Sequence, residues 1–283
     1  MKGISQLLCR YLAFFAILFS SAPSLAKLPT VISLSPHSTE LAYAAGLGDQ
    51  MLAASEYSDY PEQAKGLERV ANYRGIKLER IVTLNPGLIL AWKGGNPPRQ
   101  MEALENLGFK VVYTNPDSLE DIADAVDMLG KWSPSPEKAT ALANSLRSRF
   151  RQIQQDYRGK RPVSYFYQLS GTPLMTVSSD NWPAPVFETC GGKNIFNNSP
   201  AAYPQVSPEQ VIVRKPEVIF VSRHAEGNSP WWKNWSNEIP AVENKTVWTL
   251  NTDWLNRPTP RTLKALEQVC GYLDAVRESE KIS

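Results

Sequence analysis

Short hydrophobic runs alternate with amphipathic segments along most of this chain. "LPTVISLSP" (28–36) and "RPVSYFYQLSG" (161–171) are apolar and β-branched or aromatic, as is typical of buried strands. Each is followed by a segment that predicts a helix ending in glycines, "STELAYAAGLGDQ" (38–50) in the first half and "PAPVFETCGGKNIF" (183–196) in the second. Both halves of the chain therefore begin with a strand and then a helix.

A second pattern occurs twice and aligns without a gap. "LERIVTLNPGLIL" (78–90) matches "PEQVIVRKPEVIF" (208–220), and Glu79 falls on Glu209, an offset of 130 positions (79 to 209). Each copy predicts a short helix that begins with a glutamate, a proline break and a buried strand. The chain thus builds the same small unit once in each half.

The segment between the halves has a different, wholly helical character. "SLEDIADAVDMLGKW" (118–132) is apolar at helical spacing, and residues 133–160 predict a long amphipathic helix without a Gly/Ser-rich hinge. A stiff connection of this kind indicates two lobes that move little relative to each other.

Alternating strands and helices predict an α/β fold with parallel sheets and crossover helices. We expect two similar lobes joined by the long rigid helix, with a ligand cleft between them beyond the carboxyl ends of the strands. The predicted segments are a signal peptide (1–26), an N-terminal lobe (27–117), a bridging helical segment (118–160) and a C-terminal lobe (161–283).

The first 26 residues predict export through a cleaved signal peptide. Lys2 and Arg10 precede a nine-residue apolar run (11–19). The small residues Ser24 and Ala26 are suited to cleavage after Ala26. The alternatives are a membrane anchor, for which about 20 apolar residues are needed, and a lipoprotein, which would need a cysteine at the cleavage site. We expect a soluble periplasmic protein.

The charge and cysteine content of the exported chain narrow its partners and suggest a crosslink. The full chain has 30 basic and 28 acidic residues, and loss of Lys2 and Arg10 makes the two counts equal, which gives no electrostatic case for nucleic acid or an anionic membrane. Cys190 and Cys270 remain and predict one disulfide, worth roughly 4 to 5 kcal/mol in a chain-entropy model, with two buried free thiols as the alternative.

Residues that carry catalysis or bind metals are scarce. Beyond the signal peptide the histidines are His37 and His224, and no His/Cys spacing, G-x-S-x-G turn or phosphate-binding loop occurs. His37 follows the first strand and could face a cleft, but such a histidine is more often a surface residue at a helix entry. We therefore expect neither an enzyme nor a metal site.

Aromatic residues occur where the predicted strands end. Tyr57, Tyr73, Trp92, Tyr203 and Trp254 each lie next to loop-forming residues. Any one of them could simply cap the core. Together at the mouth of a cleft they would form walls for a large, flat, mainly uncharged ligand, which a few polar groups would orient. Asp253 and Arg257 are the candidates for those groups.

These segments also carry a family resemblance. In order along the chain, "SDYP", "LERIV", "AWKGGN", "KWSPSPEKA", "CGGKNIF", "PQVSPEQ" and "TDW" resemble the periplasmic cobalamin-binding proteins of ABC importers, from about residue 29 to the last helix. The resemblance implies a helix-bridged substrate-binding protein that captures cobalamin between its lobes. It implies delivery of cobalamin to an inner-membrane permease and no bound cofactor of its own.

The resemblance assigns ligand contacts by position. They are Tyr57, Tyr73, Trp92, Tyr203, Asp253, Trp254, Leu255, Asn256 and Arg257, and the family's disulfide corresponds to Cys190 with Cys270. This chain has Tyr at 73 and 203 where the family member has Trp, and Leu255-Asn256 where it has Phe-Glu. A tyrosine keeps a flat wall but offers less area, so the corrin would sit differently or bind more weakly.

The repeated glutamates have a role in the family. Glu79 and Glu209 would dock onto arginines of the two permease subunits, a symmetric dimer that works with ATPase subunits. The simpler interpretation is that a glutamate in a first helical turn is favoured by the helix dipole, by about 0.3 to 1 kcal/mol.

Two other functions compete with cobalamin transport. A carrier of the same fold for haem would favour His or Tyr as an axial ligand, and one for a ferric siderophore would favour several arginines in the cleft. An exported enzyme on this frame would need a nucleophile with a base or a pair of carboxylates, and the sequence indicates neither.

Overall fold

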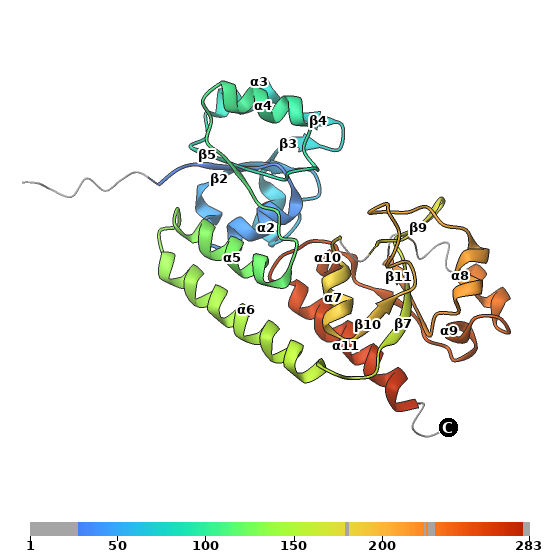
Figure 1. Ribbon diagram of the computed structural model, residues 1–283. Coiled ribbons are helices and arrows are strands. Elements are labelled where there is room, and N and C mark those ends of the chain that lie inside the picture. Colours follow the sequence, from blue (N-terminus) through green and yellow to red (C-terminus); the bar gives the residue numbers. More distant parts are fainter. Residues whose placement is uncertain (1–27, 179–180, 224, 226–229, 280–283) are drawn as a thin grey trace, which may run out of the picture.

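The computed structural model describes residues 28–178, 181–223, 225 and 230–279 (Figure 1). The predicted signal peptide and His224 lie outside the described residues. Among the described helices, none combines the length and the apolar character that crossing a membrane requires.

A six-stranded sheet forms the centre of the N-terminal lobe, and four helices cover it. The elements are β1 (Val31–Ser33), α2 (Pro36–Ala44), η2 (Gly48–Gln50), β2 (Met51–Ser55), η3 (Glu62–Gly66), β3 (Glu68–Asn72), β4 (Gly75–Ile76), α3 (Leu78–Leu84), β5 (Leu88–Ala91), α4 (Pro98–Asn106), β6 (Val111–Tyr113) and α5 (Leu119–Gly130). The strand order is β4-β3-β2-β1-β5-β6, parallel except for β4. Helices α2 and α5 cover one face, and α3 and α4 cover the other (Figure 1).

The C-terminal lobe has a smaller sheet of four strands in the order β10-β7-β11-β12, all parallel. Its elements are β7 (Val163–Gln168), β8 (Ser170–Gly171), β9 (Leu174–Met175), α7 (Ala184–Thr189), β10 (Gly192–Asn194), α8 (Pro208–Arg214), β11 (Val218–Ser222), η5 (Pro230–Trp235), α9 (Pro240–Glu243), β12 (Val247–Leu250), α10 (Thr252–Leu255) and α11 (Thr262–Ser279). Helices α7 and α11 pack on one face of this sheet, and α8 and α9 lie on the other. The predicted α/β architecture with two parallel-type sheets is confirmed.

The repeat seen in the sequence holds residue by residue in the structure. Helix α8 starts and ends 130 positions after α3 (78 to 208, 84 to 214), and β11 begins 130 positions after β5 (88 to 218). Both helices end in a left-handed residue, Asn85 with φ 45° and Lys215 with φ 47°, whose backbone N–H closes the last turn. The strand arrangement β2-β1-β5-β6 also matches β10-β7-β11-β12.

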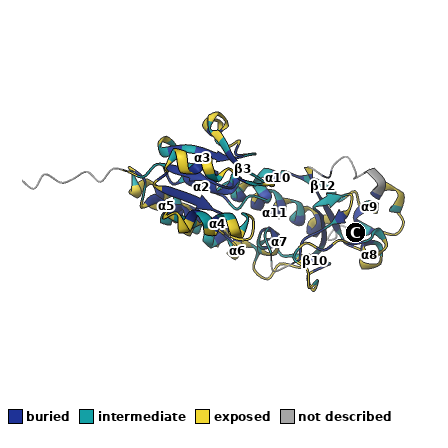
Figure 2. Ribbon diagram, turned by 90° about the horizontal axis from the view of Figure 1, so that it is seen from above, coloured by how far each residue is buried: buried dark blue, intermediate teal, exposed yellow. Residues whose placement is uncertain are grey.

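The connection between the lobes is the 22-residue helix α6 (Pro136–Tyr157), about 33 Å long at 1.5 Å per residue. It runs beneath both lobes, packing on α5 at its start and near α7 and α11 at its end (Figure 1). Its buried residues Ala143, Leu146 and Phe150 belong to one apolar cluster that contains the facing helices of both lobes. Figure 2 shows the buried residues along the sheets of each lobe. The predicted long bridging helix is therefore present and is part of a core that both lobes share.

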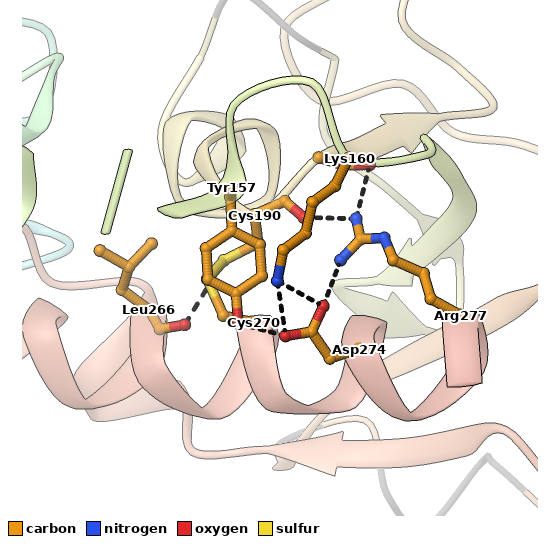
Figure 3. The surroundings of a disulfide bond; sticks show 8 residues. Tyr157, Lys160, Cys190, Leu266, Cys270, Asp274 and Arg277 are labelled. Carbon is orange, nitrogen blue, oxygen red and sulfur yellow. Dashed lines mark hydrogen bonds and ion pairs between the residues drawn. A yellow bond between two sulfur atoms is a disulfide. The ribbon is translucent and has the colours of Figure 1, made fainter. Parts of the chain in front are cut away.

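The predicted disulfide joins Cys190 to Cys270, so the alternative of two free thiols is wrong. It fastens the end of α7 to the middle of α11 (Figure 3). The guanidinium of Arg277 donates to the Cys190 carbonyl (2.6 Å) and to Asp274 (2.8 Å), and Asp274 also accepts from the Tyr157 hydroxyl at 2.6 Å. The last turn of the bridging helix is thus tied to the crosslinked pair of helices, which fixes α6 in the C-terminal lobe.

Candidate ligand-binding cleft

A cleft of about 510 Å³ lies between the two lobes. Its walls come from the loops at the carboxyl ends of the strands, where ligands of open α/β sheets bind. The described residues that line it are Pro36, His37, Trp92, Lys93, Gly94, Asn115, Pro116, Asp117, Leu169, Val177, Asn181, Trp182, Pro183, Tyr203, Asn256, Arg257 and Pro258. Of the predicted ligand contacts, the structure brings Trp92, Tyr203, Asn256 and Arg257 together in this lining.

Trp92 forms the N-terminal wall and is held by the turn that follows β5. Its backbone N–H donates to the Asn96 side chain at 2.7 Å, and Asn96 donates in turn to the Leu34 carbonyl at 2.9 Å. A Cβ at Gly95 would lie only 1.9 Å from the Trp92 ring, so the ring folds over a position that only glycine can occupy. The ring is fixed in place yet about half exposed, which leaves a face available for a ligand.

His37 lies beneath Trp92, and the expectation of a surface histidine is wrong. Its side chain is 6% exposed, and its ring meets Trp92 edge to face with centroids 5.4 Å apart. Nε2 donates to the Thr114 carbonyl at 2.9 Å, so Nδ1 is the acceptor and faces the Ser35 hydroxyl at 3.2 Å. Burial lowers the pKa of His37 to about 4, against the raising effect of the Thr114 carbonyl and with help from the charge of Arg257. The ring is therefore neutral at neutral pH.

A layer of buried hydroxyl groups holds the loops of the N-terminal rim together. Ser38 bonds to Thr114 at 2.6 Å, and Ser58 bonds to Thr39 at 2.8 Å and to Ser55 at 3.0 Å. These bonds link the first turn of α2, which carries His37, to the loops after β2 and β6, which carry Tyr57 and Asn115. Buried hydroxyls are tolerated because they satisfy one another, and they fix loops that would otherwise be free to move.

The opposite wall consists of Tyr203 and Trp182. The strand-like segment that carries Tyr203 is fixed by backbone hydrogen bonds from Thr176 to the Pro204 carbonyl (3.1 Å) and from Ser178 to the Ala202 carbonyl (3.0 Å). Partial burial raises the pKa of the Tyr203 phenol, and the charge of Asp117, from the other side of the cleft, adds to the effect. Trp182, which the sequence did not single out, lines the cleft together with Tyr203 on the side of the C-terminal lobe, and Trp92 lines it on the side of the N-terminal lobe.

The predicted contacts in α10 have different positions. Leu255 is fully buried in the core, and its carbonyl accepts from the Trp182 indole at 2.8 Å, so we expect it to support the wall and not to touch a ligand. Asn256 lines the cleft and accepts from the Tyr167 hydroxyl at 3.0 Å. Trp254 is outside the lining, half-buried against the core with the Lys264 ammonium 5.4 Å from its ring centre.

Tyr57 and Tyr73 extend the rim beyond the cleft lining. They are 72% and 80% exposed and follow β2 and β3, whose carboxyl ends share the sheet edge with that of β5. Tyr57 has φ 63°, a left-handed conformation that is costly for a non-glycine residue and that points to a functional constraint. Two large aromatic rings this exposed on one edge are available to a ligand larger than the cleft itself.

An ion cluster joins the two lobes beside the cleft. Nη1 of Arg257 lies 3.0 Å from Glu40 and 2.6 Å from Asp59 of the N-terminal lobe, and Nη2 lies 3.1 Å from Asp253. Arg261 donates to both oxygens of buried Glu40. Burial would lower the pKa of Arg257, but its bonds to Asp59 and Glu40 outweigh this and raise it. Asp253 and Arg257, predicted to orient a ligand, are therefore paired with each other. Arg257 also pairs with Glu40 and Asp59 across the lobes.

The repeated glutamates lie on the outside of the molecule. Glu79 and Glu209 are exposed second residues of α3 and α8, and neither lines the cleft. The Ser207 hydroxyl and the local backbone N–H lower the pKa of Glu209. Within the described parts of the chain, no three His, Cys, Asp or Glu side chains group together as a metal site would require.

Comparison with known proteins gives consistent matches. Residues 31–253 match the model of a family described as periplasmic binding protein. The chain is 49% identical over 278 residues to a vitamin B12-binding protein of Vibrio vulnificus, covering 98% of this chain and 99% of that protein. The crystal structure of the periplasmic vitamin B12 binding protein BtuF of Vibrio cholerae aligns with a TM-score of 0.85 at 50% identity, over 88% of this chain and 98% of that one. The periplasmic heme-binding protein RhuT from Roseiflexus sp. RS-1, at 21% identity and a TM-score of 0.74 over 87% and 98%, shares the fold.

The buried neutral His37 generates a pH-dependent stability. Because its pKa falls from 6.5 in the unfolded chain to about 4 when folded, the unfolded state binds more protons between these values. The contribution of His37 to the free energy of unfolding is therefore complete above pH 6.5 and falls with decreasing pH by about 3 kcal/mol near pH 4. His37→Gln, which keeps a donor for Thr114, should lose this part of the pH dependence. The free energy of unfolding, measured with urea at pH 7.5, 5.5 and 4.5, tests this prediction. An equal loss of this free energy with falling pH in the wild-type protein and in His37→Gln would contradict it.

Proposed function

Because the chain belongs to the periplasmic binding protein family, we propose that it captures cobalamin in the periplasm and delivers it to an inner-membrane ABC permease. Cobalamin is the transported ligand, the chain catalyses no reaction on it, and no resident cofactor is needed. Residues 1–26 serve as the cleaved signal peptide that brings the protein to the periplasm.

The observation that carries this proposal is the pair of facing aromatic walls in the cleft. Trp92 on one lobe and Tyr203 with Trp182 on the other present flat apolar surfaces that suit a large planar ring system. The chain is about 50% identical to proteins named for vitamin B12 binding over most of its length, which supports the same class of ligand. Tyr57 and Tyr73 would contact the parts of the ligand that project beyond the cleft.

The same cleft is less suited to haem or to a ferric siderophore. Both ring nitrogens of His37 are engaged by Ser35 and Thr114, so an axial bond from it to haem iron would cost an existing hydrogen bond. Arg257 is the one arginine among the described lining residues, and it is already paired with carboxylates. At 21% identity, the similarity to a heme-binding protein supports a shared fold and gives no argument for haem as the ligand.

The proposed partner is a homodimeric permease with its ATPase subunits. Glu79 and Glu209 occupy equivalent positions on equivalent helices, and both carboxylates are exposed. Two matching carboxylates, one per lobe, are suited to pair with cationic side chains on two copies of one subunit.

Titration of the purified protein with candidate ligands tests the function. Cyanocobalamin should quench tryptophan fluorescence with a saturable curve at micromolar protein, because Trp92 and Trp182 would stack against it. Haemin and a ferric siderophore should bind at least about tenfold more weakly, since His37 is already hydrogen-bonded, Arg257 is already paired, and the raised pKa of Tyr203 disfavours a phenolate ligand to iron. Absence of saturable cyanocobalamin binding would remove the basis of the proposal.

Trp92→Ala should weaken cobalamin binding by about 1 to 3 kcal/mol, because it removes one wall of the cleft while His37 and Asn96 keep the turn in place. Trp132→Ala is the matched control, since Trp132 packs half-buried against the core, away from the cleft. The control should lose stability and keep its affinity. Calorimetry and thermal unfolding separate the two effects, and the opposite pattern would make Trp92 a core residue.

The double change Glu79→Ala with Glu209→Ala should leave the cobalamin affinity intact and slow transport into vesicles that contain the permease, because two charge-assisted pairs are lost. Raised salt should slow transport by the wild-type protein in the same way. Glu137→Ala with Glu278→Ala, exposed on α6 and at the end of α11, is the control with the same change in charge. An undiminished rate for the Glu79/Glu209 variant at sub-saturating carrier would mean that these residues only begin helices.

A further inference from the structure

The charges around the cleft are arranged in an unexpected way. Among the described lining residues, Lys93, Asp117 and Arg257 carry charge, and His37 is neutral. A lone arginine in a binding cleft is ordinarily the group that takes hold of a ligand carboxylate, because its planar fork pairs with two oxygens. Here that arginine has three carboxylate neighbours.

The guanidinium of Arg257 is surrounded by Glu40, Asp59 and Asp253. Glu40 and Asp59 share Nη1 at 3.0 and 2.6 Å, and Asp253 holds Nη2 at 3.1 Å. Arg261 adds a second positive charge and pairs with Glu40. Three carboxylates against two guanidinium groups leave the cluster with an excess negative charge.

The three carboxylates differ in their exposure, which separates two roles. Glu40 is buried and binds both arginines, so it joins the lobes. The side chains of Asp59 and Asp253 are 48% and 45% exposed and bind no other cation than Arg257 among the ion pairs of the described chain. These two aspartates pair with the guanidinium nitrogens that a ligand carboxylate would otherwise bind.

We propose that Asp59 and Asp253 are specificity residues that exclude anionic ligands from the cleft by occupying Arg257. A ligand carboxylate would have to displace one aspartate and then lie beside the other, and like charges brought together in a partly buried site repel strongly. An uncharged planar ligand meets no such penalty. This inference rests on the proposed function, since it concerns the choice among ligands of the same cleft.

The test compares two porphyrins with the same ring system, deuteroporphyrin with two carboxylates and its dimethyl ester, in which both carboxylates are uncharged methyl esters. The wild-type protein should bind the diester more tightly than the diacid. Asp59→Asn with Asp253→Asn should raise the affinity for the diacid by about tenfold or more and change that for the diester little, because Arg257 then keeps Glu40 as its one carboxylate partner and the cluster changes from an excess negative to an excess positive charge. Adding Arg257→Gln to this variant should abolish the gain, which shows that the guanidinium is responsible.

Asp124→Asn with Asp127→Asn is the matched control. These aspartates flank Arg147 on the outer side of the bridging helices, at 2.6 and 3.8 Å, so their loss changes the net charge equally without touching the cleft. An equal gain in the control, or no gain for the diacid in the Asp59/Asp253 variant, would overturn the inference. Titration of the wild-type protein with cyanocobalamin is a separate measurement that tests the proposed function. A failure there would refute the proposed function, while the porphyrin comparison would still decide the role of the aspartates.

Discussion

The cleft depends on a fixed separation between the lobes, and the apolar core that passes through both of them supplies it. Helix α6 contributes Leu146 and Phe150 to a cluster that contains Leu41 of the N-terminal lobe and Phe187 of the C-terminal lobe. Opening the lobes like a hinge would expose this cluster to water, at a cost that grows with the apolar area exposed. Rigid walls have less conformational entropy to lose when a ligand binds, so the shared core favours tight binding without adding a contact.

Polar interactions fix the rim of the cleft and the relative orientation of the lobes, which the apolar core alone does not determine. The core sets the distance between the lobes, while the hydroxyl groups of Ser38, Thr39 and Ser58 tie the first turn of α2 to the rim loops. Beside the cleft, Glu40 binds two arginines of the other lobe. A buried carboxylate of this kind adds little net stability, because its desolvation offsets the attraction to its partners. Its effect is geometric, since only one relative position of the lobes satisfies all of its bonds.

The sequence predicted the parts of the molecule that depend on local patterns. Alternating strands and helices, the 130-residue offset of Glu79 and Glu209 and the long connecting helix all follow from periodicity and from residues a few positions apart. The positions of His37, Trp182 and Glu40 depend on partners far along the chain: His37 on Thr114, and Glu40 on Arg257, 217 residues away. Nothing near His37 or Glu40 in the sequence indicates these partners, and both residues have ordinary roles at a helix start. Leu255 shows a different dependence on the whole fold, because a position that matches a ligand contact in the family carries a side chain that is fully buried in the core.

The repeat is strict on the outer face and is lost where the lobes face each other. Helices α3 and α8 have the same length, a left-handed residue at the same position after the last turn, and a glutamate at the same position in the first turn. At the cleft, the N-terminal lobe adds β3 and β4 with Tyr73, and the C-terminal lobe adds the β8–β9 hairpin beside the segment of Tyr203. A ligand without two-fold symmetry needs two different walls, so the duplicated lobes had to diverge there. The proposed partner of two identical subunits would need two identical contacts, which would account for the likeness of the outer helices. The distribution of symmetry over the surface therefore fits the proposed function, in which an asymmetric ligand binds in the cleft and the two matching helices meet a symmetric partner.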